Sequence, residues 1–298
     1  MVRIAAEDPK VMAITAAMLE GTGLTEFARK HPERFFDVGI AEQHAVNFAA
    51  GLAIGGYKPV VAIYSTFLPR AYDQIYQDVC LQDLPVVFAL DRAGLVPDDG
   101  PTHQGVNDIA YLRQMPNMIV MAPRDENELQ HMLWTALGAG HPAAVRFPKS
   151  RASGVPVDGE FRTLPVGRAE VLREGRDLFL ALGSMVAPAL EAAEALEIEG
   201  VSLAVADARF AKPVDEDLIL EYASPGRTII TAEEGVLAGG FGSAVREVLD
   251  RAGRFGVRFL ALGLSLEPSR VGKRAELLRD HGLDAAGLAE RILAFTRT

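Results

Sequence analysis

The 298-residue sequence has little cysteine, no excess of positive charge and no long apolar run. Cys80 is the single cysteine, so one chain can build neither a disulfide framework nor a thiolate metal site. The formal net charge of −10 argues against a nucleic-acid-binding surface. No apolar run approaches the roughly 20 residues that span a bilayer, and the first residues lack the apolar segment of a signal peptide. These absences predict a cytoplasmic protein without a membrane or nucleic-acid partner.

The six histidines are also sparse, and they show no spacing typical of metal ligands. No metal site made by this chain alone is therefore expected. What the sequence does contain is an ordinary soluble balance, with 49% hydrophobic and 23% charged residues. At this length the chain can build two domains, each with its own core.

Short apolar strand candidates alternate with helix candidates along the first half, which is typical of a parallel sheet covered by helices on both faces. Ligands of such sheets bind at the carboxyl ends of the strands. The loop at 91–107 is long for this setting, and unusually long loops are often functional. The strand candidates are 11–15, 34–38, 59–63, 85–90, 118–121 and 143–146, and the helix candidates are 24–31, 41–54, 66–82 and 125–137.

A proline-containing, linker-like stretch divides the chain, and we predict domains over 1–152 and 166–298 joined by a linker over 153–165. The second domain is expected to open with a β-hairpin and then to resume the alternation of strands and helices. The predicted fold class is α/β, with two doubly wound domains whose mostly parallel sheets are covered by helices on both faces. The hairpin strands are 166–172 and 178–182, the later strands are 202–206, 228–231 and 257–262, and the helices are 186–196, 216–222, 242–252 and 285–295.

Two features admit simple structural explanations. Glu42 lies in the first turn of the predicted 41–54 helix, where an acid complements the helix dipole by roughly 0.3–1 kcal/mol. Gly240 and Gly242 belong to a glycine-rich stretch between a strand and a helix, but this stretch lacks the third glycine of the dinucleotide fingerprint. A tight turn is the better interpretation of these glycines, and it disfavours a dinucleotide-binding oxidoreductase.

Four stretches together resemble the 1-deoxy-D-xylulose-5-phosphate synthase family of the transketolase superfamily. They are 37–45 (DVGIAEQHA), 64–77 (YSTFLPRAYDQIYQ), 91–105 (DRAGLVPDDGPTHQG) and 144–149 (AVRFPK). The resemblance covers the carboxyl-terminal portion of the family, a pyrimidine-binding domain followed by the transketolase C-terminal domain. The family's first domain holds the diphosphate of thiamin diphosphate and Mg²⁺, and it has no counterpart in this sequence.

The resemblance implies an activity and a set of partners. The activity is the decarboxylative carboligation of pyruvate with D-glyceraldehyde 3-phosphate to 1-deoxy-D-xylulose 5-phosphate, a precursor of isoprenoids, thiamin and pyridoxal. This chain would supply the pyrimidine-side half of the active site, would need an N-terminal half, and would form a homodimer. The resemblance also implies that the second domain does not touch the reacting centre.

The resemblance assigns three residues to thiamin diphosphate. Glu42 would share a proton with a ring nitrogen of the aminopyrimidine and so favour the tautomer that can act as an intramolecular base. Phe67 would stack on the same ring, although a core-facing role is commoner for such a residue. Ile40 is the third cofactor-binding candidate. His44 is expected to pack beside them, and Arg70 is expected either to join the site or to form a structural ion pair.

Arg92 and the motif Arg146-Phe147-Pro148-Lys149 are implied to bind the phosphate of the aldehyde. Lys149 stands where the family pattern leads us to expect arginine, so the charge is kept but the planar fork is lost. For each of these cations, an ordinary surface ion pair is the alternative.

Three further residues complete the candidate site. Tyr64 is implied to line the substrate channel. Asp99 and His103 are placed at the substrate end of the pocket, where a histidine can shuttle a proton or donate to a carbonyl. Without the motif, His103 is as readily explained as a residue that anchors the loop.

Two alternatives stay open at this point. The β subunit of a 2-oxo acid dehydrogenase has a similar length and pairing of domains, although Gln43, His44 and the 91–105 loop favour the synthase. The other alternative is a catalytically silent fragment, because half of the family's active site is not encoded in this sequence.

Overall fold

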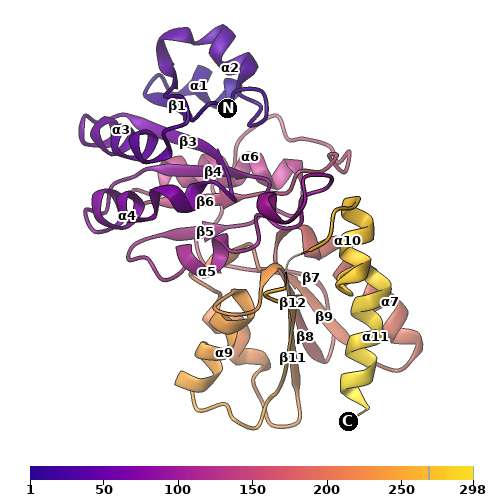
Figure 1. Ribbon diagram of the computed structural model, residues 1–298. Coiled ribbons are helices and arrows are strands. Elements are labelled where there is room, and N and C mark those ends of the chain that lie inside the picture. The colour runs from indigo at the N-terminus through magenta and orange to yellow at the C-terminus, as the bar shows by residue number, and fades with distance from the viewer. Residues whose placement is uncertain (268, 298) are drawn as a thin grey trace.

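The computed structural model describes residues 1–267 and 269–297, which form two lobes (Figure 1). We call the elements from Val2 to Arg146 the first lobe and those from Glu170 to Thr296 the second lobe. Each lobe contains one mostly parallel sheet, so the predicted fold class is confirmed. No helix in the described part of the chain is both long enough and apolar enough to cross a bilayer.

The larger sheet belongs mainly to the first lobe. Its strands are β1 (Val11–Thr15), β2 (Phe35–Asp37), β3 (Lys58–Tyr64), β4 (Val87–Asp91), β5 (Ile119–Met121), β6 (Ala143–Arg146) and β10 (Phe210–Lys212). Their order across the sheet is β10-β5-β6-β4-β3-β1-β2, and only β10 is antiparallel to its neighbour. Every residue of β1, β5 and β6 is buried, as expected for strands covered on both faces.

Helices cover the two faces of this sheet with separate apolar cores. On one face α1, α2 and α6 bury residues such as Ile4, Phe27 and Met132 against alternate strand positions. On the other face α3 and α5 pack residues such as Ala45 and Leu112 against the intervening positions. The bounds of these helices are α1 (Val2–Glu7), α2 (Thr25–Lys30), α3 (Glu42–Ile54), α5 (Asp108–Leu112) and α6 (Glu126–Gly138).

The smaller sheet lies in the second lobe. Its strands are β7 (Glu170–Arg173), β8 (Asp177–Ala181), β9 (Leu203–Asp207), β11 (Thr228–Val236) and β12 (Arg258–Leu264), in the order β12-β11-β8-β9-β7. Its helices are α7 (Val186–Ile198), α8 (Glu216–Tyr222), α9 (Phe241–Arg251), α10 (Arg274–Asp280) and α11 (Ala285–Thr296). α7 and α11 pack on one face, while α8 and α9 pack on the other.

Two predictions about elements are wrong. β7 does not form a hairpin with β8, because it pairs antiparallel with β9 at the sheet edge, and β8 lies between β9 and β11. The predicted 66–82 helix is also not continuous. Leu68–Ala71 is a 3₁₀ turn with Pro69 in its first turn, α4 (Tyr72–Gln74) is one short α-helical segment, and Ile75–Cys80 is π-helical. Pro69 has no backbone N–H to donate, so a continuous α-helix cannot extend through this position from residue 66.

β10 was not predicted, and it links the two lobes. Phe210–Lys212 leaves the second lobe and pairs with β5 at the edge of the larger sheet. Its three residues are too few to show a strand period. The proposed division into 1–152, 153–165 and 166–298 stays a prediction, and residues 268 and 298 of the last range lie outside the described residues.

Candidate active site

The candidate residues gather at the carboxyl ends of the parallel strands of the larger sheet. Tyr64 ends β3, Asp91 ends β4, and Arg146 ends β6. The register places Tyr64 opposite Asp91, and Leu90 opposite Arg146. Consecutive short apolar strands therefore bring motifs from distant parts of the sequence to one edge, where ligands of such sheets bind.

Glu42 is the first residue of α3 and is only 1% exposed. The turn before it depends on Gly39, whose φ of +71° lies in the left-handed region, and on Asp37, whose Oδ1 accepts the Gly39 N–H at 3.0 Å. Arg70 Nη1 donates to Glu42 Oε1 at 2.5 Å. The buried carboxylate thus has one charged partner, which comes from the broken helix after β3.

Phe67 is the centre of an aromatic group beside Glu42. Its ring lies 5.7 Å from the ring of Tyr64 in a stacked arrangement and 5.5 Å from the ring of His103 in an edge arrangement. The guanidinium of Arg70 lies over the Phe67 ring, with its carbon 4.7 Å from the centroid. His103 is oriented further by a 2.9 Å contact between its Nδ1 and the hydroxyl of Thr102.

The Glu42 carboxylate and the Phe67 ring together suit an aminopyrimidine. The Arg70 guanidinium is planar and carries N–H donors, and it contacts both the Glu42 carboxylate and the Phe67 face. An aminopyrimidine ring is likewise planar, is able to share a proton with a carboxylate, and stacks on an aromatic face. The residues present therefore fit the pyrimidine end of thiamin diphosphate.

Arg92 lies beyond Tyr64, with its guanidinium carbon 3.6 Å from the Tyr64 ring centroid. Its Nη1 donates to Asp91 Oδ2 and to the Gly21 carbonyl, both at 2.9 Å. Arg92 adopts a φ of +61°, an unusual conformation that Asp91 supports by accepting its N–H at 2.6 Å. Burial raises the pKa of Asp91 more than the adjacent Arg92 lowers it.

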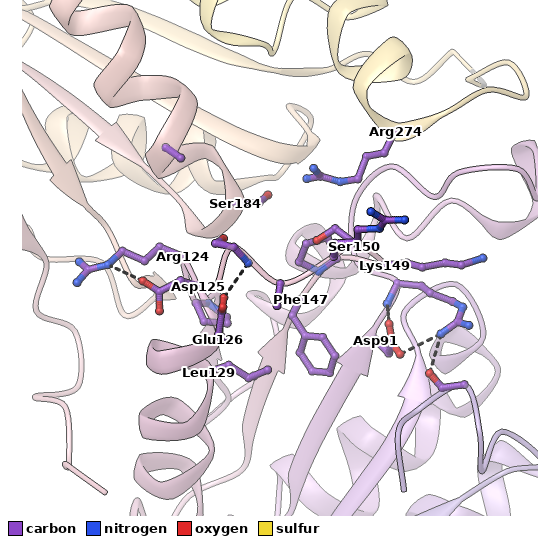
Figure 2. A pocket seen from close by; sticks show the side chains of 18 residues that line it. Asp91, Arg124, Asp125, Glu126, Leu129, Phe147, Lys149, Ser150, Ser184 and Arg274 are labelled. Carbon is purple, nitrogen blue, oxygen red and sulfur yellow. Dashed lines mark hydrogen bonds and ion pairs between the residues drawn. The ribbon is translucent and has the colours of Figure 1, made fainter. Parts of the chain in front are cut away.

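A cavity of about 530 Å³ lies between the two lobes (Figure 2). Both Arg92 and Lys149 line it. Lys149 Nζ forms an ion pair with Asp99 Oδ2 at 3.1 Å, so these two predicted substrate residues lie together. Arg274 and Ser184 reach the same cavity from the second lobe. The cavity therefore collects cations from both lobes and suits an anionic ligand.

Of the candidate residues, Arg92 and Lys149 line this cavity, and Tyr64 and Asp99 contact them from outside the lining. Two further candidates are placed elsewhere. Arg146 does not line this cavity: it is 5% exposed, and it donates to Asp108 Oδ2 and to the Glu234 carbonyl, both at 2.9 Å. Ile40 is 81% exposed on the turn before α3, on the surface of this chain. His44 is exposed and lies against Phe48, with ring centroids 6.2 Å apart, as expected of a packing residue.

Sequence reasoning missed the acidic pair at the carboxyl end of β11. Glu233 and Glu234 are both fully buried, and Glu234 contacts the 91–107 loop through Leu95. The available signal was two adjacent acids within an apolar strand, Thr228–Val236, which is an unusual place for charge.

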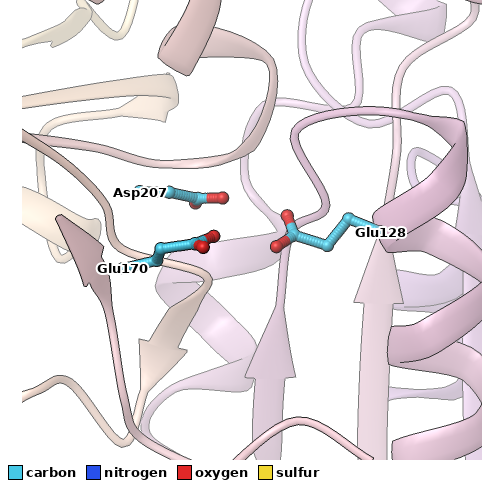
Figure 3. Close-up of side chains that lie close together, drawn as sticks. All are labelled: Glu128, Glu170 and Asp207. Atoms are coloured by element: carbon cyan, nitrogen blue, oxygen red, sulfur yellow. The ribbon is translucent and has the colours of Figure 1, made fainter. Parts of the chain in front are cut away.

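Three carboxylates elsewhere lie close enough to raise the question of a metal site. Oxygens of Glu128, Glu170 and Asp207 lie within 4.8 Å of one another (Figure 3). Arg209 donates to Glu128 at 2.7 Å and also to Glu170, and Arg124 donates to Glu170 at 2.6 Å. Two arginines therefore occupy the carboxylate oxygens, and we interpret the cluster as an ion-pair network between the lobes.

Comparisons with known proteins identify the family. Residues 1–153 match the family described as transketolase, pyrimidine binding domain, and residues 167–288 match the transketolase C-terminal domain. The chain is 57% identical over 296 residues to 1-deoxy-D-xylulose-5-phosphate synthase 1 of Geobacter metallireducens, covering 99% of this chain and 47% of the relative. It is 57% identical over 294 residues to the synthase of Pelotomaculum thermopropionicum, covering 98% of this chain and 46% of the relative. The chain thus spans about half the length of the curated relatives it matches.

Solved structures agree with this assignment. A structure titled as a split gene transketolase, inactive beta4 tetramer, superposes with a TM-score of 0.85 at 34% identity, covering 98% of this chain and 94% of that one. A transketolase variant of Pichia stipitis superposes with a TM-score of 0.78 at 20% identity, which shows the shared fold; the match covers 98% of this chain and 44% of that chain. This chain belongs to the transketolase family, and it resembles the carboxyl-terminal half of 1-deoxy-D-xylulose-5-phosphate synthases.

Proposed function

We propose that this chain supplies the pyrimidine-side half of a thiamin-diphosphate-dependent active site that joins pyruvate to D-glyceraldehyde 3-phosphate, giving 1-deoxy-D-xylulose 5-phosphate. The observation that carries the proposal is the buried carboxylate of Glu42 at the start of α3, which the Arg70 guanidinium connects to the face of Phe67. The curated relatives are named synthases, and they do not favour the 2-oxo acid dehydrogenase alternative.

In this proposal each residue has one task at the cofactor. When bound, thiamin diphosphate would supply a carbon nucleophile for the reaction with pyruvate. Glu42, which is excluded from water, would hold the pyrimidine end of the cofactor and would hold or release a proton there. Phe67 offers its ring face and so fixes the orientation of the pyrimidine. Ile40 is assigned to the rim of this site, where its exposed side chain would be covered by an N-terminal half.

The substrate end of the proposed site is cationic. Arg92 and Lys149 line one cavity, and we assign them to the phosphate of the aldehyde. Asp99 holds Lys149. His103 lies edge-on to Phe67, and we assign it the role of a hydrogen-bond donor or proton carrier. Tyr64 supports the Arg92 guanidinium with its ring. Arg146 is assigned a structural role: it is buried, and its bond to Asp108 stabilises the end of β6.

We further propose that the complete enzyme needs an N-terminal half that holds the cofactor diphosphate and Mg²⁺, and that it works as a homodimer in the cytoplasm. The split gene transketolase that this chain resembles is titled as an inactive assembly of β chains. By analogy, this chain alone is expected to self-associate and to be catalytically silent, and the second of these is what the fragment hypothesis states.

The test is turnover of the reconstituted enzyme. This chain is co-expressed with the N-terminal half of a curated relative, and product formation from pyruvate and D-glyceraldehyde 3-phosphate is measured with thiamin diphosphate and Mg²⁺. Glu42→Gln is expected to lower kcat about 100-fold or more while the fold is retained. Glu26→Gln, an exposed change on α2, is the matched control and should leave kcat unchanged. Turnover by Glu42→Gln close to that of the wild type would remove Glu42 from the mechanism.

A further inference from the structure

The buried carboxylate of Glu234 connects three segments of the chain. Its Oε1 accepts the Leu95 N–H at 2.8 Å, its Oε2 accepts the Ser184 hydroxyl at 2.6 Å, and Arg274 forms an ion pair with it. Leu95 belongs to the long loop of the first lobe, whereas Ser184 and Arg274 belong to the second lobe. A buried carboxylate with donors on both oxygens is held in one place, so it can act as a fixed anchor.

The loop is built to approach this anchor closely. Gly94 has a φ of +79°, and a Cβ added there would lie 2.6 Å from the carboxyl carbon of Glu234. A larger side chain at Gly94 would therefore push the loop away from Glu234. Gly94 and Gly105 also exchange both backbone hydrogen bonds, at 2.7 and 3.0 Å, so a displacement at Gly94 moves both ends of the loop.

Further contacts hold the loop to the second lobe beyond Leu95. The Val236 N–H donates to the Val106 carbonyl at 2.9 Å, and the Asp98 N–H donates to the Gly272 carbonyl at 3.1 Å. These backbone contacts flank the region of the loop that contains Asp99 and His103. Glu234 is the only one of these anchors in the described residues that acts through a side-chain charge.

We propose that Glu234 is a positioning residue for the aldehyde phosphate: it fixes the 91–107 loop so that Arg92 keeps its place in the cavity lining, Asp99 its contact with Lys149, and His103 its contact with Phe67. The second lobe is then a determinant of substrate binding, although the resemblance implied that it stands apart from the reacting centre. The effect on aldehyde binding rests on the proposed function. The effect of Glu234 on the position of the loop does not.

Glu233 is a matched control on the same strand. It is as deeply buried as Glu234, but its two oxygens accept the N–H groups of Phe241 and Gly242, both at 2.8 Å, at the start of α9. Replacing Glu233 changes a buried acid of β11 without removing a contact to the loop. A general loss of stability in β11 can thereby be separated from loss of the anchor.

The first test is hydrogen–deuterium exchange of peptides that cover residues 92–106 in the full chain. Glu234→Ala is expected to raise exchange at Leu95 and its neighbours at least tenfold, Glu234→Gln is expected to restore part of the protection, and Glu233→Gln should match the wild type. Ser184→Ala removes the hydroxyl that donates to Glu234 Oε2 and leaves the carboxylate itself in place. It replaces Glu234→Ala in this test if that variant does not fold. Loop exchange in the folded variants equal to that of the wild type would overturn the proposal.

The second test uses the chain reconstituted with an N-terminal half. Glu234→Gln is expected to raise KM for D-glyceraldehyde 3-phosphate about tenfold, while kcat and KM for pyruvate stay within about twofold of the wild type. Equal rises in both KM values, or a fall in kcat alone, would overturn the positioning role. A wild-type complex that makes no product would instead overturn the proposed function, and the exchange experiment would still decide the role of Glu234.

Discussion

The Arg70 guanidinium contacts the two groups that we assign to the cofactor pyrimidine. Glu42 is buried, whereas the side chain of Arg70 is half exposed, so the ion pair joins the interior to the surface. A ring that binds Glu42 and stacks on Phe67 competes with Arg70 for the same carboxylate and the same ring face. Arg70 therefore supplies the charged partner of the carboxylate in the chain alone, and under the proposed function it would have to move to admit a pyrimidine.

Removing the Arg70 side chain tests this role. Arg70→Ala leaves the buried Glu42 carboxylate without its charged donor, and we expect a loss of about 1–3 kcal/mol in the free energy of unfolding, measured by urea denaturation. Arg29→Ala breaks an exposed ion pair with Glu26 and should have no measurable effect. If both variants lose the same amount, then Arg70 is an ordinary surface residue.

At the scale of elements, Glu233 connects β11 to α9. Its carboxylate accepts two N–H groups at the first turn of the helix, which stabilises the helix start. Burial nevertheless raises its pKa to about 7, because the loss of hydration outweighs those hydrogen bonds and the more distant Arg146. The carboxyl group is therefore protonated in the folded chain over a pH range in which it is ionised in the unfolded chain.

This shift predicts a direction for stability against pH. Between the ordinary pKa of 4.5 and the folded value of about 7, the folded state holds a proton that the unfolded state has released. The contribution of Glu233 is therefore most favourable below pH 4.5, falls as pH rises to 7, and is constant above it, for a total of ~3 kcal/mol. Urea denaturation across pH 5–8 should show this fall in the wild type and a flatter profile in Glu233→Gln. Parallel profiles would contradict the assignment.

Most elements follow from local patterns in the sequence. The 216–222 helix and the 11–15 and 143–146 strands have the predicted bounds, because each is a compact apolar or amphipathic run between turn residues. The hairpin prediction failed because the choice of partner for β7 depends on packing within the sheet and not on the short turn at Gly175. β10 was missed because three residues carry no period.

The candidate site follows the same division. The strand-to-loop pattern correctly brings Tyr64, Arg92 and Lys149 to the carboxyl edge of one sheet. It cannot show that Arg146 is buried against Asp108, because that contact depends on the approach of α5. Nor can it show Glu234, whose partners Leu95 and Ser184 are 139 and 50 residues away. A local sequence pattern therefore cannot predict which residues of the two lobes will be in contact.

At the scale of the molecule, the two lobes are joined by more than the chain between them. β10 adds a strand of the second part of the chain to the larger sheet, and one apolar core contains both Ile109 of the first lobe and Val245 of the second. The carboxylates of Figure 3 add charge to this junction. Burial and the nearby Glu128 raise the pKa of Asp207 well above its ordinary value, even though Arg124 opposes the shift.

Arg209 is the residue on which this network most depends, since it pairs with both Glu128 and Glu170. Arg209→Ala leaves the nearly fully buried Glu128 without its charged donor, so we expect a loss of about 3–5 kcal/mol in the free energy of unfolding at pH 7.5. The loss should be smaller at pH 5, because an uncompensated carboxyl group avoids the cost of burial by taking up a proton. Arg246→Ala, which breaks an exposed pair with Asp250, is the control at both pH values.

The same network yields a prediction about metal ions. If Arg124 and Arg209 already occupy the oxygens of Glu128, Glu170 and Asp207, millimolar Mg²⁺ or Mn²⁺ should leave the Tm of the wild-type chain unchanged, because a cation would first have to displace an arginine. In Arg209→Ala the vacated oxygens face one another, and a divalent cation should restore part of the lost stability. A rise in Tm of the wild type, reversed by chelation, would show that the arginines do not close the site and that the cluster of Figure 3 binds a metal.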